Sequence, residues 1–150
     1  MDIFLTLLVM VCLFVLKGFF SGCEIAMVSA DKVKLNALAG KGHKGSRMVL
    51  DEFRSPEILL GTTLVGTNVA TIVLTTIGTL LVIQLVGENG EWIAFLLFTP
   101  LFLILGEIVP KSVYQHRSTE IAPKAIYALR GFRFLFFPLV VVFSRLARFA

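Results

Sequence analysis

The chain has 150 residues, of which 57% are apolar and 16% charged, with a net charge of +4 and a mean hydropathy of +0.89. Soluble domains contain about 45–50% apolar and about 25% charged residues, so we expect a single domain that lies in a lipid bilayer. This composition excludes disorder, a collagen-like repeat and a disulfide scaffold. We expect no nucleic-acid partner, because the basic residues flank the apolar runs instead of forming a separate patch.

Three apolar segments are long enough to cross the hydrocarbon core of a membrane, which takes about 20 helical residues. They cover residues 3–29, 58–86 and 92–109. The first carries no Lys or Arg before Lys17, so it lacks the basic start of a cleaved signal peptide and is predicted to be a retained span. The predicted fold is an all-α membrane protein with three transmembrane helices that contain broken or kinked segments.

The polar connection of residues 30–57 is predicted to form an amphipathic helical loop on the cytosolic side. Its apolar positions indicate helix, with breaks at Gly40, Gly42 and Gly45. Ser55 is a candidate N-cap for the next helix, because Pro56 follows at the first helical position.

The distribution of Lys and Arg predicts the orientation of the chain. They are abundant in residues 30–57 and absent from residues 87–91, which puts the first loop inside and the second outside. The N-terminus is then outside and the C-terminus cytosolic, in a multi-pass protein of the plasma or inner membrane. Residues 118–150 are predicted to form an interfacial belt or helical hairpin, since their longest apolar run, 134–143, is too short to span. The alternative is an ordinary fourth span.

Polar groups interrupt the apolar segments at three places: residues 21–24, 66–68 and 106–111. A charge at the bilayer centre costs about 2.5–3.5 kcal/mol on insertion scales, so it usually faces a cavity or a partner. Glu24 either reaches the interface, pairs with Lys17 or Lys111, or belongs to a site. Gly18 and Gly22 form a GxxxG step, which is typical of helix packing. Together with residues 58–86 it offers a face for a second copy of the chain.

The second and third clusters are expected to coincide with breaks in the helices. A break near Gly66 would free backbone carbonyls beside Asn68, which begins a polar stripe with Thr71, Thr75 and Thr79. These threonines equally well bond back to their own helix.

The third span is expected to end at Pro110, because a residue before proline is pushed out of helical geometry. That residue is Val109, and the end would free the carbonyls of Leu105 and Gly106 beside Glu107. The alternative is that Glu107 is simply hydrated at a helix end among the headgroups.

The donors in these clusters are oxygens from Ser, Asn, Glu and the backbone, which suit Mg²⁺, Ca²⁺ or Na⁺ and argue against zinc and copper. Enzymatic activity is not expected. His43 and His116 both lie outside the apolar segments, and the sequence contains no HExxH, GxSxG or P-loop motif.

These three clusters resemble the transmembrane domain of the CorC/cyclin M magnesium transporters. The matching strings are FFSGCEIA at residues 19–26, TLVGTNVA at 63–70 and GEIVPKS at 106–112, in that order along nearly the whole chain. The resemblance implies Mg²⁺ transport, as export coupled to Na⁺ entry, by a homodimer of three-span protomers. It also implies cytosolic cystathionine-β-synthase-type domains, which this chain does not include.

The resemblance also implies an ion site. The family's metal ligands correspond to Ser21, Asn68 and Glu107. Further candidate donors are the Cys23 backbone, Gly66, Gly106, Glu24 and Ser29. The chain departs from the family pattern in two places: Cys23 stands where Ser is frequent, and a second Asn, common near Thr71 in the family, is replaced here. Two other functions stay open, a cation channel and a non-transporting membrane anchor or Mg²⁺ sensor.

Overall fold

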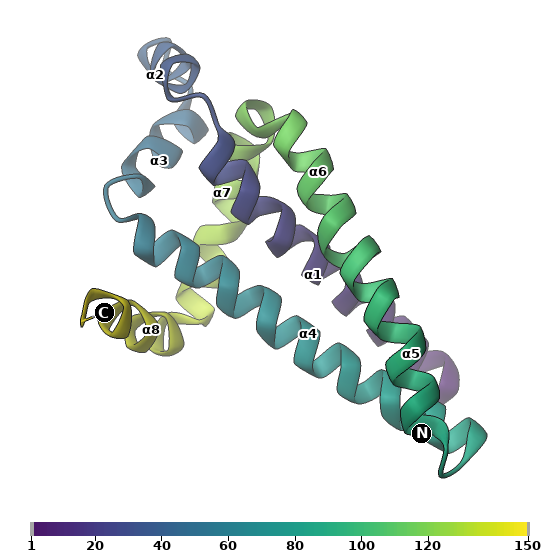
Figure 1. Ribbon diagram of the computed structural model, residues 1–150. Coiled ribbons are helices and arrows are strands. Elements are labelled where there is room, and N and C mark those ends of the chain that lie inside the picture. Colours follow the sequence, from purple (N-terminus) through teal and green to yellow (C-terminus); the bar gives the residue numbers. More distant parts are fainter. Residues whose placement is uncertain (1, 150) are drawn as a thin grey trace.

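The computed structural model describes residues 2–149, except for the side chains of Phe143, Ser144, Ala147 and Arg148. Three of its helical stretches are long and apolar enough to cross a membrane, as predicted: Ile3–Ser29, Pro56–Val86 and Gly90–His116. They converge at one end of the molecule and diverge toward the other (Figure 1). No strand occurs between residues 2 and 149.

The first two spans are uninterrupted α-helices, α1 (Ile3–Ser29) and α4 (Pro56–Val86). The predicted break in α4 near Gly66 is therefore wrong. Gly66 is instead a point of close approach, because a Cβ there would lie 2.7 Å from ring atoms of Phe20 on α1. Small residues in membrane helices allow such approach without breaking the helix.

The third span consists of α5 (Gly90–Leu103), a π-helical turn η1 (Ile104–Ile108) and α6 (Val109–His116). The predicted helix end at Pro110 is wrong, since Val109 is helical with φ −63° and ψ −51°. The wider π turn lets the Val109 N–H donate to the Ile104 carbonyl. Because this turn holds one extra residue, the proline ring avoids the clash that an α-helical turn would impose.

The polar connection forms two short helices, α2 (Lys32–Gly40) and α3 (Lys44–Glu52). The chain reverses at Gly42, whose φ of +89° favours glycine. The prediction of a break at Gly45 is wrong, because this residue lies inside α3 and packs against the Pro123 carbonyl. Pro56 starts α4 as predicted, but the Ser55 hydroxyl makes no capping bond.

Residues after the third span form α7 (Ser118–Leu135) and α8 (Phe137–Phe149). In Figure 1, α7 lies between the diverging ends of the spans and α8 lies beside α4. Neither belongs to the three helices that can cross a membrane. An interfacial position for α7 and α8 stays a prediction.

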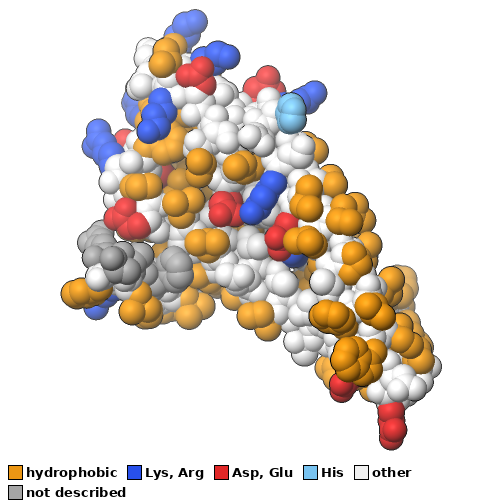
Figure 2. All heavy atoms as spheres, in the orientation of Figure 1, with side chains coloured by type: hydrophobic (Ala, Val, Ile, Leu, Met, Phe, Trp, Pro, Cys, Tyr) orange, Lys and Arg blue, Asp and Glu red, His pale blue; other side chains and the backbone are white. Residues whose placement is uncertain are grey.

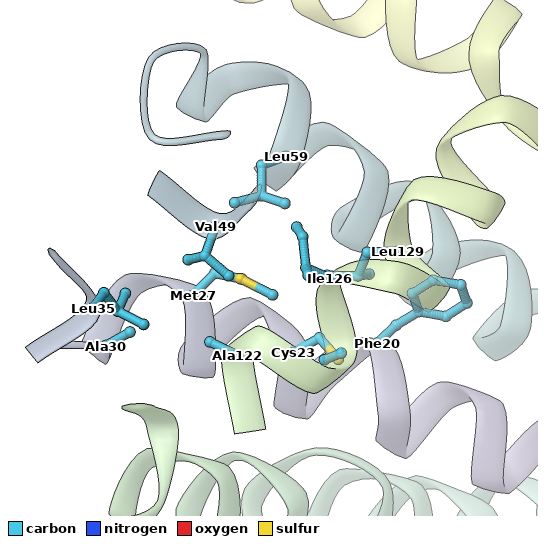
Figure 3. Packing of buried hydrophobic residues seen from close by; sticks show 11 residues of the cluster. Phe20, Cys23, Met27, Ala30, Leu35, Val49, Leu59, Ala122, Ile126 and Leu129 are labelled. Atoms are coloured by element: carbon cyan, nitrogen blue, oxygen red, sulfur yellow. The ribbon is translucent and has the colours of Figure 1, made fainter. Parts of the chain in front are cut away.

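The main core lies at the diverging end, where α1, α3, α4 and α7 meet. Figure 3 shows its buried side chains pointing toward one another. They include Phe20, Cys23, Met27, Val49, Leu59, Ile126 and Leu129. The carboxylate of Glu52 is also buried here, and Arg130 and Arg133 each donate to it at 3.0 Å. Apolar packing and this ion cluster together join α7 to the spans.

Candidate cation site

Two ion pairs connect α1 with the third span, and their charges are arranged in opposite order. Lys17 Nζ lies 2.6 Å from Glu107 Oε1, and Lys111 Nζ lies 3.3 Å from Glu24 Oε2. Thus α1 contributes a lysine and then a glutamate, whereas η1–α6 contributes a glutamate and then a lysine. Figure 2 shows acidic and basic side chains adjacent midway along the molecule, apart from the charged cluster at its upper end.

The two pairs differ in depth. The Lys17 side chain is 1% exposed, and its ammonium also donates to the Phe102 carbonyl at 3.3 Å. Glu107 is 33% exposed, while Glu24 and Lys111 are 25% and 42% exposed. Of the partners predicted for Glu24, the structure selects Lys111. The Lys17 ammonium is therefore buried, whereas the other three charged side chains, Glu107 included, are partly exposed.

Two glycines of α1 allow this close contact. A Cβ on Gly18 would lie 3.3 Å from Pro110 Cγ, and a Cβ on Gly22 would lie 2.6 Å from a ring atom of Tyr114. The GxxxG step therefore packs α1 against α6 of the same chain. Our expectation that these glycines offer a face to a second copy is wrong, because α6 already covers them.

Ser21 lies between the two ion pairs along α1, one helical turn beyond Lys17. It is fully buried, and its hydroxyl forms no hydrogen bond with any described residue. A buried polar group without a partner costs about 1–3 kcal/mol. Thr67 Oγ1 on α4 is also a buried hydroxyl oxygen that forms no hydrogen bond with a described residue. Ser21 is thus an oxygen donor that the protein itself leaves available.

Only part of the polar stripe predicted on α4 lies in a single cleft. Thr71, Thr75 and Thr79 line one cleft, of about 350 Å³, as their spacing predicts. The hydroxyls of Thr71 and Thr75 also donate to carbonyls one turn back, at 2.8 Å. Asn68 lies on the exposed surface of α4.

The remaining candidate donors have structural contacts of their own. A Cβ on Gly106 would lie 3.2 Å from the Lys17 side chain, and Cys23 is buried in the main core. The Ser29 carbonyl accepts a hydrogen bond from Ser118 at 3.0 Å. No cluster of three His, Cys, Asp or Glu side chains that could hold a metal occurs among the described residues.

The pairing of Lys17 with Glu107 was not predicted, because Lys17 was expected only as a partner for Glu24. The available signal was the lysine itself. An ammonium inside an apolar segment requires an acceptor, and Glu107 is the other carboxylate in the segments 3–29, 58–86 and 92–109.

These features define a class: a three-span membrane domain with charge pairs and unused oxygen donors inside its helical bundle. The family of the cyclin M transmembrane N-terminal domain matches residues 7–150. The chain belongs to this family.

Three relatives illustrate its range. The chain is 26% identical over 133 residues to the UPF0053 inner membrane protein YfjD of Escherichia coli and 31% identical over 136 residues to a UPF0053 protein of Haemophilus influenzae. These alignments cover 89% and 91% of this chain. It is also 26% identical over 160 residues to the polyamine export protein of Haemophilus influenzae, an alignment that covers 98% of the chain. The chain spans about a third of these relatives, at 31%, 32% and 37% of their lengths.

Proposed function

We propose that the chain forms the cation pathway of a Mg²⁺ transporter that exports Mg²⁺ in exchange for Na⁺. The observation that carries this proposal is the buried Ser21 hydroxyl, which has no hydrogen-bond partner among the described residues and lies on the helix that contacts Glu107. A serine oxygen, a carboxylate and an amide oxygen are hard ligands of the kind that Mg²⁺ selects. Family membership supports ion transport as the general activity.

Asn68 is proposed to complete the site from α4. It is exposed in the single chain, so it would join Ser21 and Glu107 after a movement of α4 or the addition of a second protomer. We propose a homodimer that packs through α4, because the glycines of α1 are already covered. The same proposal includes a cytosolic C-terminus, an interfacial position for α7 and α8, and further cytosolic domains.

The decisive experiment is Mg²⁺ flux in proteoliposomes with and without an opposing Na⁺ gradient. Flux that requires the gradient and is abolished by Glu107→Gln and Asn68→Ala supports exchange. Flux that ignores Na⁺ identifies a channel, and absence of flux with intact Mg²⁺ binding identifies a sensor or anchor. Glu88→Gln is the matched control, since this exposed carboxylate lies in the turn between α4 and α5 and does not line the cleft.

A second candidate cargo is a linear organic polycation. The 350 Å³ cleft exceeds what a bare metal ion fills, and it has Glu91 and Glu107 among its lining residues with Phe95 and Phe98 between them. Carboxylates and aromatic faces both attract ammonium groups. The relative named a polyamine export protein favours testing this cargo. Spermidine should then compete with Mg²⁺ flux in wild-type protein, and Glu91→Gln should weaken that competition.

A further inference from the structure

Lys17 is the least exposed charged side chain that the structure describes. Its ammonium has two acceptors, the Glu107 carboxylate at 2.6 Å and the Phe102 carbonyl at 3.3 Å. Its aliphatic stem passes Gly106, where a Cβ would lie 3.2 Å from Cδ. The absence of a side chain at Gly106 therefore lets the ammonium reach the carboxylate of the next residue.

Lys17 and Glu107 both line the 350 Å³ cleft. A cation that enters the cleft therefore meets a carboxylate whose charge Lys17 already neutralises. Two cations that share one carboxylate repel each other strongly in a medium of low dielectric constant. Occupation of Glu107 by Lys17 and occupation by a cargo cation therefore compete with each other.

We propose that Lys17 is a tethered counter-cation, which holds Glu107 in the empty site and is displaced when the cargo cation binds. The inference rests on the proposed function, because it takes Glu107 as a cargo ligand. It adds a specificity-determining residue. A divalent ion gains about twice the Coulomb energy of a monovalent ion at the same carboxylate, so it displaces an ammonium more readily than Na⁺ does.

The pair of Lys17 and Glu107 also explains how a buried ammonium is tolerated in the cargo-free state. Removing one partner of a buried pair leaves the other charge uncompensated, which is strongly destabilising. The pair therefore stabilises the cargo-free bundle, and displacement by the entering cation leaves the Lys17 ammonium with the Phe102 carbonyl as its acceptor.

The test compares Lys17→Met with Lys111→Met by calorimetric titration of the purified protein with Mg²⁺, in the presence and absence of Na⁺. Met keeps the length of the lysine stem and removes its charge. Lys17→Met should tighten the apparent Mg²⁺ Kd by about tenfold, because the competing bound state disappears, and should allow Na⁺ to compete. Lys111→Met, which breaks the other pair, should leave the Kd within about twofold. Unchanged or weaker Mg²⁺ binding in Lys17→Met overturns the inference.

Lys17→Arg covers the case in which Lys17→Met does not fold. Arginine keeps the charge and offers a bidentate partner to Glu107, so Mg²⁺ binding should weaken; unchanged or tighter binding overturns the inference. Glu107→Gln separates the two levels of the argument. If it leaves Mg²⁺ binding intact, the proposed ligand fails. If it abolishes binding while Lys17→Met does not tighten it, only the tethered-cation inference fails.

Discussion

Gly22 of α1 lies against the ring of Tyr114 of α6, so closely that a Cβ on Gly22 would stand 2.6 Å from Tyr114 Cγ. The hydroxyl end of the tyrosine is not the nearest part; the contact involves the ring carbons at the base of the side chain. Because these carbons are the ones nearest the Tyr114 backbone, a side-chain rotation moves them little. The contact therefore sets the distance between α1 and α6 and, with it, the reach of both ion pairs.

Substitution of Gly22 by Ala should destabilise the protein, because overpacking a close helix contact costs about 1–3 kcal/mol. Thermal unfolding in detergent measures the effect. Gly131→Ala on α7 is the control, since a Cβ there meets open space. Replacing this helical glycine by alanine should stabilise the protein by up to about 1 kcal/mol. Equal melting temperatures for Gly22→Ala and the wild type would contradict the packing.

The carboxylate of Glu52 is expected to hold α7 against the spans. Glu52→Gln should lower the free energy of unfolding by about 1.5–3 kcal/mol, because it weakens charge-assisted hydrogen bonds from Arg130 and Arg133. Limited proteolysis should then release α7 and α8 first. Asp51→Asn serves as the neighbouring control, as this side chain is exposed. Equal protease resistance in both variants would show that apolar packing alone suffices.

The Ser21→Ala variant tests whether Ser21 is a cation ligand or a structural residue. Its hydroxyl forms no hydrogen bond within the described chain, so its removal should leave the cargo-free protein as stable or slightly more stable, while Mg²⁺ binding weakens. Ser46→Ala is the matched case, because the buried Ser46 hydroxyl lies 2.9 Å from His43 Nδ1. It should lose about 1 kcal/mol of stability and keep its Mg²⁺ affinity. The reverse pattern would remove Ser21 from the site.

Orientation in the membrane is tested with single cysteines in a Cys12→Ala background, where Cys23 is buried. Impermeant thiol reagents should label Glu88→Cys from outside and Lys41→Cys from inside. Ala150 lies outside the described residues, so Phe149→Cys reports on the end of α8. We expect it to react from the cytosolic side. Labelling of this cysteine from outside would establish a fourth span.

Glu24→Gln should alter the Na⁺ dependence of transport more than Mg²⁺ affinity, because Glu24 pairs with Lys111 and is separate from the pair of Lys17 and Glu107. Both quantities are measured in one proteoliposome preparation. Lys111→Met, which removes the partner but keeps the carboxylate, should retain the Na⁺ response. Loss of Mg²⁺ binding in Glu24→Gln with an unchanged Na⁺ response would make Glu24 a Mg²⁺ ligand.

The sequence by itself determined the three spans and the presence of charged groups inside them. The bounds of the first span agree with the prediction to the residue, and the second begins two residues early. Membrane spans can be predicted from the sequence because the free energy of transferring a segment into lipid depends on its own length and composition. The candidate oxygens of Ser21, Asn68 and Glu107 were visible for the same reason, since a polar residue in an apolar run is conspicuous.

Only the tertiary structure decided how these groups are paired. Whether Lys17 meets Glu24 or Glu107 depends on the rotation and separation of two helices, which the close contacts at Gly18 and Gly22 set. Likewise, the rule that proline ends a helix describes a regular α-turn. The π turn before Pro110 escapes that rule by one extra residue. Spans follow from local free energies, whereas pairings follow from packing between segments that lie about 90 residues apart in the chain.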